Sequence, residues 1–456
     1  MPTISELLQR ASELQLSGHL SEAAAVYEQI LRSEPRHAPS WHQLGLIALV
    51  AGQLESAREY FRRAIISDGS QAAFHHNMGT CCAALSQMGD AQASYEQALR
   101  IDPNYPGTRA HLCFTLFARR RRAETERLLV ETLARARTTA EDRCAIATLL
   151  VSSGRFAEGW EEHEWRQQLP TYHEPRATPE RKWDRSSLAG RSILVYSEQG
   201  LGDILQLVRY IPLLKEQGGR PILAVPRSLI PLLSEANLCP LVSRDEVWPR
   251  CDFELGMWSL PWAFRTTVET VPNNVPYLQA RPVLVEQWRE RLLAYPGFRI
   301  GISWHGNPAY TGNRIRSFPL AEFAPLAQEK GVRLISLQKQ IGSQELAGLK
   351  NRFEVIDLGP DLDASGAFMD TAAVMKNLDL VISCDTATAH LAGALGVPVW
   401  LAQAAMPDWR WMRERENTPW YPTMRLFRQT KLGNWAEVFQ RMAAEVGIRG
   451  SGLGIG

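Results

Sequence analysis

Two turns carry the residues best suited to bind and act on an anionic ligand. In the first turn, Gln199–Asp203, Gly200 and Gly202 permit a tight bend and close approach of a ligand to the backbone. Asp203 stands where a helix is predicted to begin, so its carboxylate either caps backbone amides or acts as a general base. A dinucleotide-binding fingerprint would need a third glycine where Leu205 stands, and NAD is therefore not the predicted ligand.

The second turn begins at Asp385 and leads into a predicted helix that ends at Gly396. A helix N-terminus offers unpaired amides and the positive end of a dipole, which suits a diphosphate. Thr386 and Thr388 add hydroxyl donors, and His390 lies about one turn into the helix. The alternative is that Asp385 or Thr386 caps the helix and that His390 packs in the core.

A third group of polar residues follows two predicted strands. His305 and Asn307 lie in the loop after the first of these strands, and Arg316 follows further along the same loop. An arginine leaving the carboxyl end of a strand could neutralise an anionic ligand, although single arginines are more often surface residues. Gln338 comes directly after the next strand and could bond a ribose hydroxyl.

Two carboxylates, Asp361 and Asp363, form a DxD pattern that some sugar transferases use to bind a metal. Here the pattern lies in a loop flanked by glycine and proline, with no accompanying histidine. We interpret it as a turn and predict no metal site.

The elements that hold these turns are predicted from the apolar pattern beyond residue 190. Short buried runs alternate with helical patterns, which indicates a parallel sheet with ligand-binding turns at its carboxyl edge. A proline-rich break at Val271–Pro276 divides this region into two α/β halves, residues 191–275 and 276–447, with a cleft expected between them. A flexible glycine-rich tail is predicted over 448–456. The predicted strands are Ile193–Tyr196, Ile222–Val225, Ile300–Trp304, Arg333–Leu337, Leu380–Ser383 and Val397–Leu401.

The N-terminal residues follow a different pattern, with a period of 34. Gly18, Gly52 and Ser86 recur at this interval, and small and aromatic residues keep the same register after each of them. This pattern resembles the tetratricopeptide repeat. It predicts four to five helical hairpins over residues 1–167, stacked into a curved solenoid, with a degenerate unit around Arg119–Arg122.

One polar residue per repeat, Gln43, Asn77 and His111, occupies the sixth position of the first helix. Such a row could hydrogen-bond the backbone of a bound peptide, and the alternative is that these are merely solvated positions. After the repeats, a linker is predicted over residues 168–190 from Pro170, Pro175 and Pro179.

Composition narrows the function further. The 456 residues carry a formal net charge of +1, so there is no basic excess that would indicate nucleic acid binding. No apolar stretch approaches the length of a membrane span, and the N-terminus lacks a signal-peptide core. Seven cysteines without CxxC spacing fit free thiols in a reducing compartment. We therefore expect a cytoplasmic protein.

The ordered series of motifs resembles a glycosyltransferase of the GT-B type, similar to the heptosyltransferase family (glycosyltransferase family 9), fused to tetratricopeptide repeats as in some bacterial proteins. Its expected fold class is α plus α/β, a solenoid followed by two Rossmann-like halves, the first on the acceptor side and the second on the nucleotide-sugar side. The segments that carry the resemblance span nearly the whole chain and are residues 159–166, the Gly200–Asp203 turn, 302–308, 316–320, 385–396, 407–411 and 420–422.

The resemblance implies specific roles. Asp203 matches the aspartate proposed as catalytic base, Thr386 and His390 match the donor diphosphate site, and Arg316 matches a basic donor-binding position. Gln338 matches a ribose-contacting position but replaces a carboxylate seen in heptose transferases, and His305 stands where a small residue is commoner. Both departures argue against a heptose donor.

The predicted function is sugar transfer from a nucleotide-sugar, with inversion and without a metal or other cofactor, to an acceptor, expected to be a protein held by the repeats. Two alternatives stay open. The chain could be a non-catalytic adaptor with a vestigial sugar-nucleotide domain, or an epimerase of nucleotide-sugars.

Overall fold

The computed structural model describes residues 2–135, 139–169, 172, 181–310, 312–339, 341–349, 352–364 and 366–452. Packing divides the chain into two units. One comprises Met1–Leu149 with Glu162–Tyr172, and the other comprises Leu150–Glu161 with His173–Gly456. The division falls within two helices, α9 and α10.

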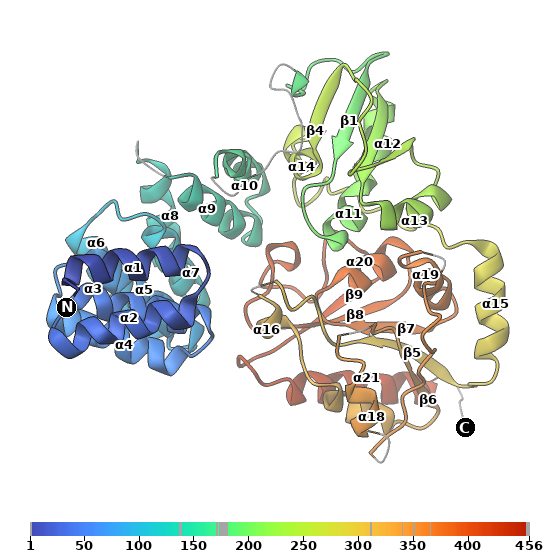
Figure 1. The fold of residues 1–456 in the computed structure, drawn as a ribbon. Helices are drawn as coiled ribbons and strands as arrows, with labels where there is room; N and C mark the ends of the chain where they lie inside the picture. The colour runs from blue at the N-terminus through green and yellow to red at the C-terminus, as the bar shows by residue number, and fades with distance from the viewer. Residues whose placement is uncertain are drawn as a thin grey trace. The chain divides into compact units, whose positions relative to one another are not determined.

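Successive helices of the first unit pack as hairpins (Figure 1). Each second helix of a hairpin buries one apolar face and leaves charged residues on the other, as α2 and α4 show. The helices of this unit are α1 (Ile4–Leu16), α2 (Leu20–Ser33), α3 (Ala38–Val50), α4 (Leu54–Ser67), α5 (Ala72–Ala84), α6 (Met88–Ile101), α7 (Thr108–Ala118) and α8 (Arg122–Leu133). Helices α9 (Ala140–Ser152) and α10 (Phe156–His163) are divided between the two units.

The turn inside each hairpin requires a left-handed backbone. Gly18, Gly52 and Gly154 adopt φ values of +81°, +73° and +84°, which glycine tolerates at no steric cost. Ser86 and Arg120 occupy the equivalent positions with φ values of +63° and +59°. The 34-residue register therefore continues through the degenerate unit, although its turn lacks a glycine.

Glycines also set the distance between the two helices of a hairpin. A Cβ atom added at Gly45 would lie 2.5 Å from the ring of Phe61, and one at Gly79 would lie 2.6 Å from the ring of Tyr95. Both rings are buried, with exposures of 0% and 2%. The small residue and the aromatic residue, which the repeat pattern pairs, thus pack directly against each other.

The second unit begins inside the predicted solenoid, and the boundary predicted at residue 167 differs from this division. Phe156 and Trp160 are 1% and 2% exposed, because they pack into the core of the α/β unit. The indole Nε1 of Trp160 donates to the carbonyl oxygen of Thr266 at 3.1 Å, and its ring meets Trp409 edge-on at 5.3 Å. The packing of these two aromatic side chains, and not the 34-residue period, therefore determines that this segment belongs to the α/β unit.

Part of the segment predicted as a linker packs against the α/β unit. Pro170, Pro175 and Pro179 lie outside the described residues, but the segment after them contributes Trp183, which is 2% exposed and donates its amide to Glu254 at 3.0 Å. The end of the predicted linker is therefore part of the α/β unit, held by a buried indole.

The first half of the α/β unit contains a parallel sheet with the strand order β3-β2-β1-β4. Its strands are β1 (Ser192–Tyr196), β2 (Arg220–Val225), β3 (Leu241–Ser243) and β4 (Phe253–Gly256), and its helices are α11 (Leu201–Leu207), α12 (Ile211–Glu216), α13 (Ile230–Glu235) and α14 (Leu260–Ala263). The parallel arrangement confirms the prediction made from strand–helix alternation.

The second half contains a parallel sheet with the order β6-β5-β7-β8-β9. Its strands are β5 (Phe298–Ser303), β6 (Val332–Ser336), β7 (Leu380–Ser383), β8 (Val399–Gln403) and β9 (Met424–Arg428). Its helices are α15 (Pro282–Leu292), α16 (Asn313–Arg316), α17 (Ala324–Ala327), α18 (Glu345–Leu349), α19 (Met369–Met375), α20 (Ala387–Ala394) and α21 (Ala436–Gly452). Since α21 continues to Gly452, the flexible tail predicted from residue 448 is wrong for 448–452, and 453–456 lie outside the described residues.

The strand orders explain where ligand-binding turns gather. In each sheet the chain reverses its direction of winding between two neighbouring strands, β1 and β4 in the first sheet and β5 and β7 in the second. Such switch points leave a crevice at the carboxyl ends of the strands. The Gly200–Asp203 turn follows β1, the His305 loop follows β5, and the Asp385 turn follows β7.

Candidate functional site

The two turns predicted to form a common site lie in contact. Helix α11, which begins in the first turn, packs against α20, which begins in the second (Figure 1). A Cβ atom added at Gly202 would lie 2.9 Å from Cδ2 of His390 and 3.4 Å from Cα of Ala387. Glycine at position 202 is therefore required by the close approach of the two helix N-termini.

One oxygen of Asp203 caps a helix, and the other is paired with an arginine. Its Oδ2 accepts a hydrogen bond from the amide of Gly200 at 2.9 Å, which caps α11. Its Oδ1 is paired with Arg410, and the side chain is 18% exposed. Burial raises the pKa of Asp203, an effect that the charge of Arg410 opposes and that of Asp408 reinforces. A raised pKa makes the ionised carboxylate a better proton acceptor.

Arg410 is a site residue for which the sequence predicted no role. It lies in the 3-10 helix η7 (Trp409–Trp411), which begins at Asp408 within the Pro-Asp-Trp-Arg-Trp segment. Its Nη1 contacts Oδ1 of Asp408 at 2.8 Å and its Nε donates to Oε1 of Gln206 at 2.5 Å. The one sequence signal that could have indicated a role for Arg410 is that residues 407–411 are among the segments that carry the family resemblance.

The N-terminus of α20 has no capping hydrogen bond from the side chain of its N-cap residue. Thr386 is the N-cap residue, and its hydroxyl lies 3.3 Å from that of Ser383 instead of capping the helix. The first amides of a helix have no intrahelical acceptor, and within the described part of the chain no side chain caps those of α20. Thr388, also predicted to bind the donor, is 9% exposed on the same helix.

Asp385 precedes this N-terminus and is held by the second half. Its Oδ2 accepts a hydrogen bond from the indole Nε1 of Trp411 at 2.8 Å. Burial raises its pKa to about 6, and the nearby carboxylate of Asp408 adds to the increase. Asp385 therefore holds a proton up to a higher pH than an ordinary aspartate.

Arg316 lies at the same N-terminus. Its Nη1 donates to the carbonyl oxygen of Asp385 at 2.7 Å, and its Nε lies 3.4 Å from Oδ1 of Asn313. The guanidinium carbon is 4.5 Å from the ring centre of Tyr310. At Gly306 an added Cβ atom would lie 2.7 Å from Nη2 of Arg316, so this glycine leaves room for the guanidinium.

His390 is buried, with 4% exposure, and its Nδ1 lies 2.8 Å from the hydroxyl of Tyr421. Its ring stacks on Trp411 at 5.4 Å. Burial lowers the pKa of His390 well below the usual value, and the charges of Arg410 and Arg316 lower it further. The imidazole is therefore neutral and can offer a ligand a hydrogen bond but no positive charge.

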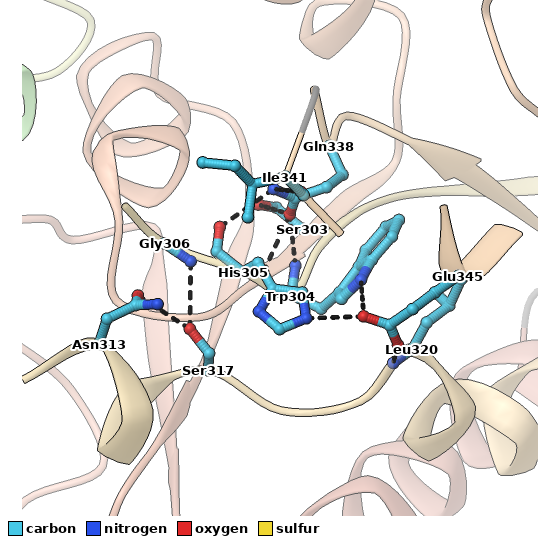
Figure 2. A network of polar contacts seen from close by, with 10 residues as sticks. All are labelled: Ser303, Trp304, His305, Gly306, Asn313, Ser317, Leu320, Gln338, Ile341 and Glu345. Atoms are coloured by element: carbon cyan, nitrogen blue, oxygen red, sulfur yellow. Dashed lines mark hydrogen bonds and ion pairs between the residues drawn. The ribbon is translucent and has the colours of Figure 1, made fainter. Parts of the chain in front are cut away.

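Gln338 and His305 belong to a hydrogen-bond network that fixes the loop after β5 (Figure 2). Oε1 of Gln338 accepts from the hydroxyl of Ser303 and the amides of Trp304 and His305, all at 3.0–3.1 Å. Its Nε2 donates to the carbonyl oxygens of His305 at 3.1 Å and Ile341 at 2.8 Å. The amide is fully used inside the protein, and a ribose contact would have to replace one of these bonds.

The same network continues on both sides of the loop (Figure 2). On one side, Nε2 of His305 lies 2.6 Å from Oε1 of Glu345, whose Oε2 accepts the amide of Leu320 at 2.9 Å. On the other side, the hydroxyl of Ser317 accepts the amide of Gly306 and donates to Oδ1 of Asn313. The same Oδ1 atom lies 3.4 Å from Nε of Arg316. The network therefore determines where Arg316 stands.

The remaining predicted residues have local contacts. Asn307 closes a turn by accepting the amide of Ala309 at 3.0 Å. Asp361 and Asp363 lie in a turn, as predicted, and Asp363 accepts the amide of Thr371 at 2.8 Å. Among the residues that the structure describes, no group of three or more His, Cys, Asp or Glu side chains could hold a metal ion.

The polar row of the repeats makes contacts within the helical unit. Oε1 of Gln43 accepts from Gln15 at 3.3 Å, and Nδ2 of Asn77 lies 2.7 Å from Nε2 of His42. Nδ1 of His111 is buried without a hydrogen-bond partner. The row is thus partly engaged inside the solenoid.

Fold and repeats together define the class of the protein: tetratricopeptide repeats followed by two α/β halves, each built on a parallel sheet. A family model described as tetratricopeptide repeat matches residues 8–73 and 42–106, which confirms the repeat prediction. The predicted fold class is likewise confirmed, since both sheets are parallel and alternate with helices. No helix within the described ranges is long and apolar enough to cross a bilayer.

Individual proteins of known sequence or structure are similar to this chain. Protein FlbA of Caulobacter vibrioides is 28% identical over 453 residues, covering 93% of this chain and 69% of that protein. An O-GlcNAc transferase mutant from Thermobaculum terrenum has a TM-score of 0.37 and 16% identity, covering 98% of this chain and 92% of its own. A family 9 glycosyl transferase from Veillonella parvula has a TM-score of 0.42 and 10% identity, covering 59% and 98%.

Proposed function

We propose that this chain is a glycosyltransferase that moves a sugar from a nucleotide-sugar donor to an acceptor hydroxyl. The observation that carries the proposal is the contact between α11 and α20. It brings a partly buried carboxylate, Asp203, beside an uncapped helix N-terminus and an arginine, Arg316. A base next to an anion-binding site is the combination that glycosyl transfer from a nucleoside diphosphate requires.

The donor diphosphate would occupy the N-terminus of α20. The amides of its first turn, the hydroxyl of Thr386 and the guanidinium of Arg316 would stabilise the negative charge that develops as the glycosidic bond breaks. A neutral His390 could add a hydrogen bond. Since these groups are already positioned, the leaving group needs no metal ion for its stabilisation.

The transfer would be a single displacement. One oxygen of Asp203 takes the proton of the acceptor hydroxyl as that hydroxyl oxygen forms a bond to the anomeric carbon of the sugar. The bond between the anomeric carbon and the diphosphate breaks, and its electron pair leaves with the diphosphate. A single attack from the opposite face inverts the anomeric configuration.

We further propose that the acceptor is a protein held by the repeats. A solenoid of helical hairpins offers an extended surface for a polypeptide. Peptide binding would exchange the internal hydrogen bonds of Gln43 and Asn77 for bonds to the peptide backbone, and His111 would supply a further bond. Because all seven cysteines are unpaired, a reducing compartment such as the cytoplasm is the proposed location.

Donor binding can be tested with the full chain. A thermal-shift screen across nucleotide-sugars, followed by calorimetry on the best ligand, should find a raised melting temperature that persists in excess EDTA. Arg316→Ala should weaken binding at least tenfold. Arg314→Ala, on the same short helix but exposed, should leave the affinity unchanged. If no nucleotide-sugar binds the wild-type chain, the adaptor alternative is favoured.

Acceptor identity needs a second experiment. Proteins that co-purify with the full chain should gain the mass of one or more sugars when the donor is added, as measured by intact-mass spectrometry. Asp203→Asn should abolish this gain while donor affinity is retained. Isomerisation of the donor without transfer would instead support the epimerase alternative.

A further inference from the structure

Arg410 joins the two halves of the α/β unit at the carboxylate of Asp203. Asp203 lies on α11, which follows β1 of the first sheet, whereas Arg410 lies in η7, which follows β8 of the second. The two residues are 207 positions apart in the sequence. Their side chains are 18% and 8% exposed, so this ion pair is largely removed from solvent.

All three nitrogens of the Arg410 guanidinium are engaged. Nη2 contacts Asp203, Nη1 contacts Asp408 at 2.8 Å, and Nε donates to Gln206 at 2.5 Å. Gln206 is fully buried and lies one helical turn after Asp203 on α11. The planar group is therefore oriented by both halves at once, which a lysine ammonium could not reproduce.

Two indole rings complete the enclosure. The guanidinium carbon of Arg410 lies 4.3 Å from the ring centre of Trp409 and 5.1 Å from that of Trp258. Trp258 belongs to the first half and Trp409 to the second. These faces attract the cation and exclude water, which strengthens its interaction with the neighbouring carboxylate.

The charges that face Asp203 come from several elements. They are the guanidiniums of Arg410 in η7 and Arg316 in α16 and the carboxylate of Asp408. His390 of α20 is neutral, for the reason given above. Without Arg410, Asp203 would therefore face the carboxylate of Asp408 with only Arg316 to offset it, in a site where burial already disfavours its ionised form.

We propose that Arg410 is a positioning residue that keeps the carboxylate of Asp203 ionised and oriented, so that the base is complete only when the two halves are packed against each other. The inference rests on the proposed function, in which Asp203 accepts the proton of the acceptor hydroxyl. Each oxygen of Asp203 has one protein partner, Gly200 or Arg410, and each retains a free lone pair for that proton.

The decisive measurement is the pH dependence of kcat for Arg410→Gln and Arg410→Lys in the full chain. Arg410→Gln removes the charge and should lower kcat at neutral pH about 100-fold or more, and it should move the acid limb of the profile to higher pH. Arg410→Lys keeps the charge and should leave the acid limb near its wild-type position, with a lower kcat. Donor affinity should stay within about twofold in both variants.

Three results would overturn the inference: an unchanged acid limb in Arg410→Gln, an equal displacement in both variants, or a loss of donor affinity that accounts for the loss of rate. A readout without turnover keeps the inference separate from the proposed function. Infrared difference spectra over a pH titration report the protonation of Asp203, with Asp203→Asn identifying its band. Arg410→Gln should raise the pH at which this carboxyl protonates, even if no sugar donor is ever found, and an unchanged titration would refute the pairing.

Discussion

Replacing Gln338 by Glu changes one NH2 group into an oxygen, and it should destabilise the α/β unit. In the wild-type chain Nε2 of Gln338 donates to the carbonyl oxygens of His305 and Ile341. A carboxylate in the same place keeps the three hydrogen bonds that Oε1 accepts but turns its second oxygen toward these two carbonyls. Two donated bonds are lost, and two acceptors face a negative charge.

The expected loss follows from these contacts. At about 0.5–1.5 kcal/mol per hydrogen bond, two bonds correspond to about 1–3 kcal/mol at neutral pH. The repulsion raises the pKa of the introduced carboxyl group above its unfolded value, and the protonated form can donate to one of the two carbonyls. The loss should therefore be largest at pH 7–8 and should shrink as pH falls toward 5.

Urea denaturation followed by tryptophan fluorescence is a suitable assay, because all tryptophans except Trp41 and Trp165 lie in the α/β unit. The matched control is Gln287→Glu on the exposed face of α15, which should change the free energy of unfolding by less than about 0.5 kcal/mol. Equal stability of Gln338→Glu and wild type at pH 7.5, or a loss that does not depend on pH, would refute this account. It would also remove the structural reason for an amide where heptose transferases carry a carboxylate.

Three further predictions concern single residues. Gly202→Ala should lower the stability of the α/β unit by about 1–3 kcal/mol and reduce sugar transfer, because the added methyl group would clash with His390; Gly348→Ala, with open space around it, should be neutral or slightly stabilising in the same urea titration. Arg120→Gly should raise the stability of the helical unit by about 0.5–1 kcal/mol, measured by helical circular dichroism, because the turn requires a positive φ; an unchanged midpoint would show that this arginine is unstrained. Asp385→Asn should stabilise the α/β unit more at pH 7 than at pH 5. The raised pKa of this buried carboxyl means that its ionised form, which dominates at pH 7, destabilises the folded state, and asparagine removes that cost. A gain of equal size at both pH values would contradict the buried-carboxyl argument.

The repeats and most of the strands could be predicted because their signals are local. The 34-residue period, the buried runs such as Leu380–Ser383 and the glycine turns each depend on a few neighbouring residues. Three strands with weaker signals were not predicted: β3 has three residues, β4 contains Glu254, and β9 contains Arg425 and Arg428. Glu254 is buried but paired with Arg181, a contact that no local pattern reveals.

The roles of site residues were harder to predict, because one side chain often satisfies several partners. Asp203 was expected either to cap a helix or to act as a base, and its two oxygens allow both. Gln338 is predicted to contact a ribose, and the structure shows that its amide also supports the loop after β5. The five groups that hydrogen-bond with the side-chain amide of Gln338 come together only because β5 pairs with β6.

By itself the sequence determined the elements, their order and the residues capable of chemistry, because hydrophobic periodicity and turn chemistry act over short distances along the chain. Only the tertiary structure decided that Arg410 faces Asp203, that Gly202 lies against α20, and that Trp160 belongs with the α/β core. These contacts join residues up to 207 positions apart. These contacts depend on how the side chains of two helices and two sheets fit together, and no single segment of the sequence contains that information.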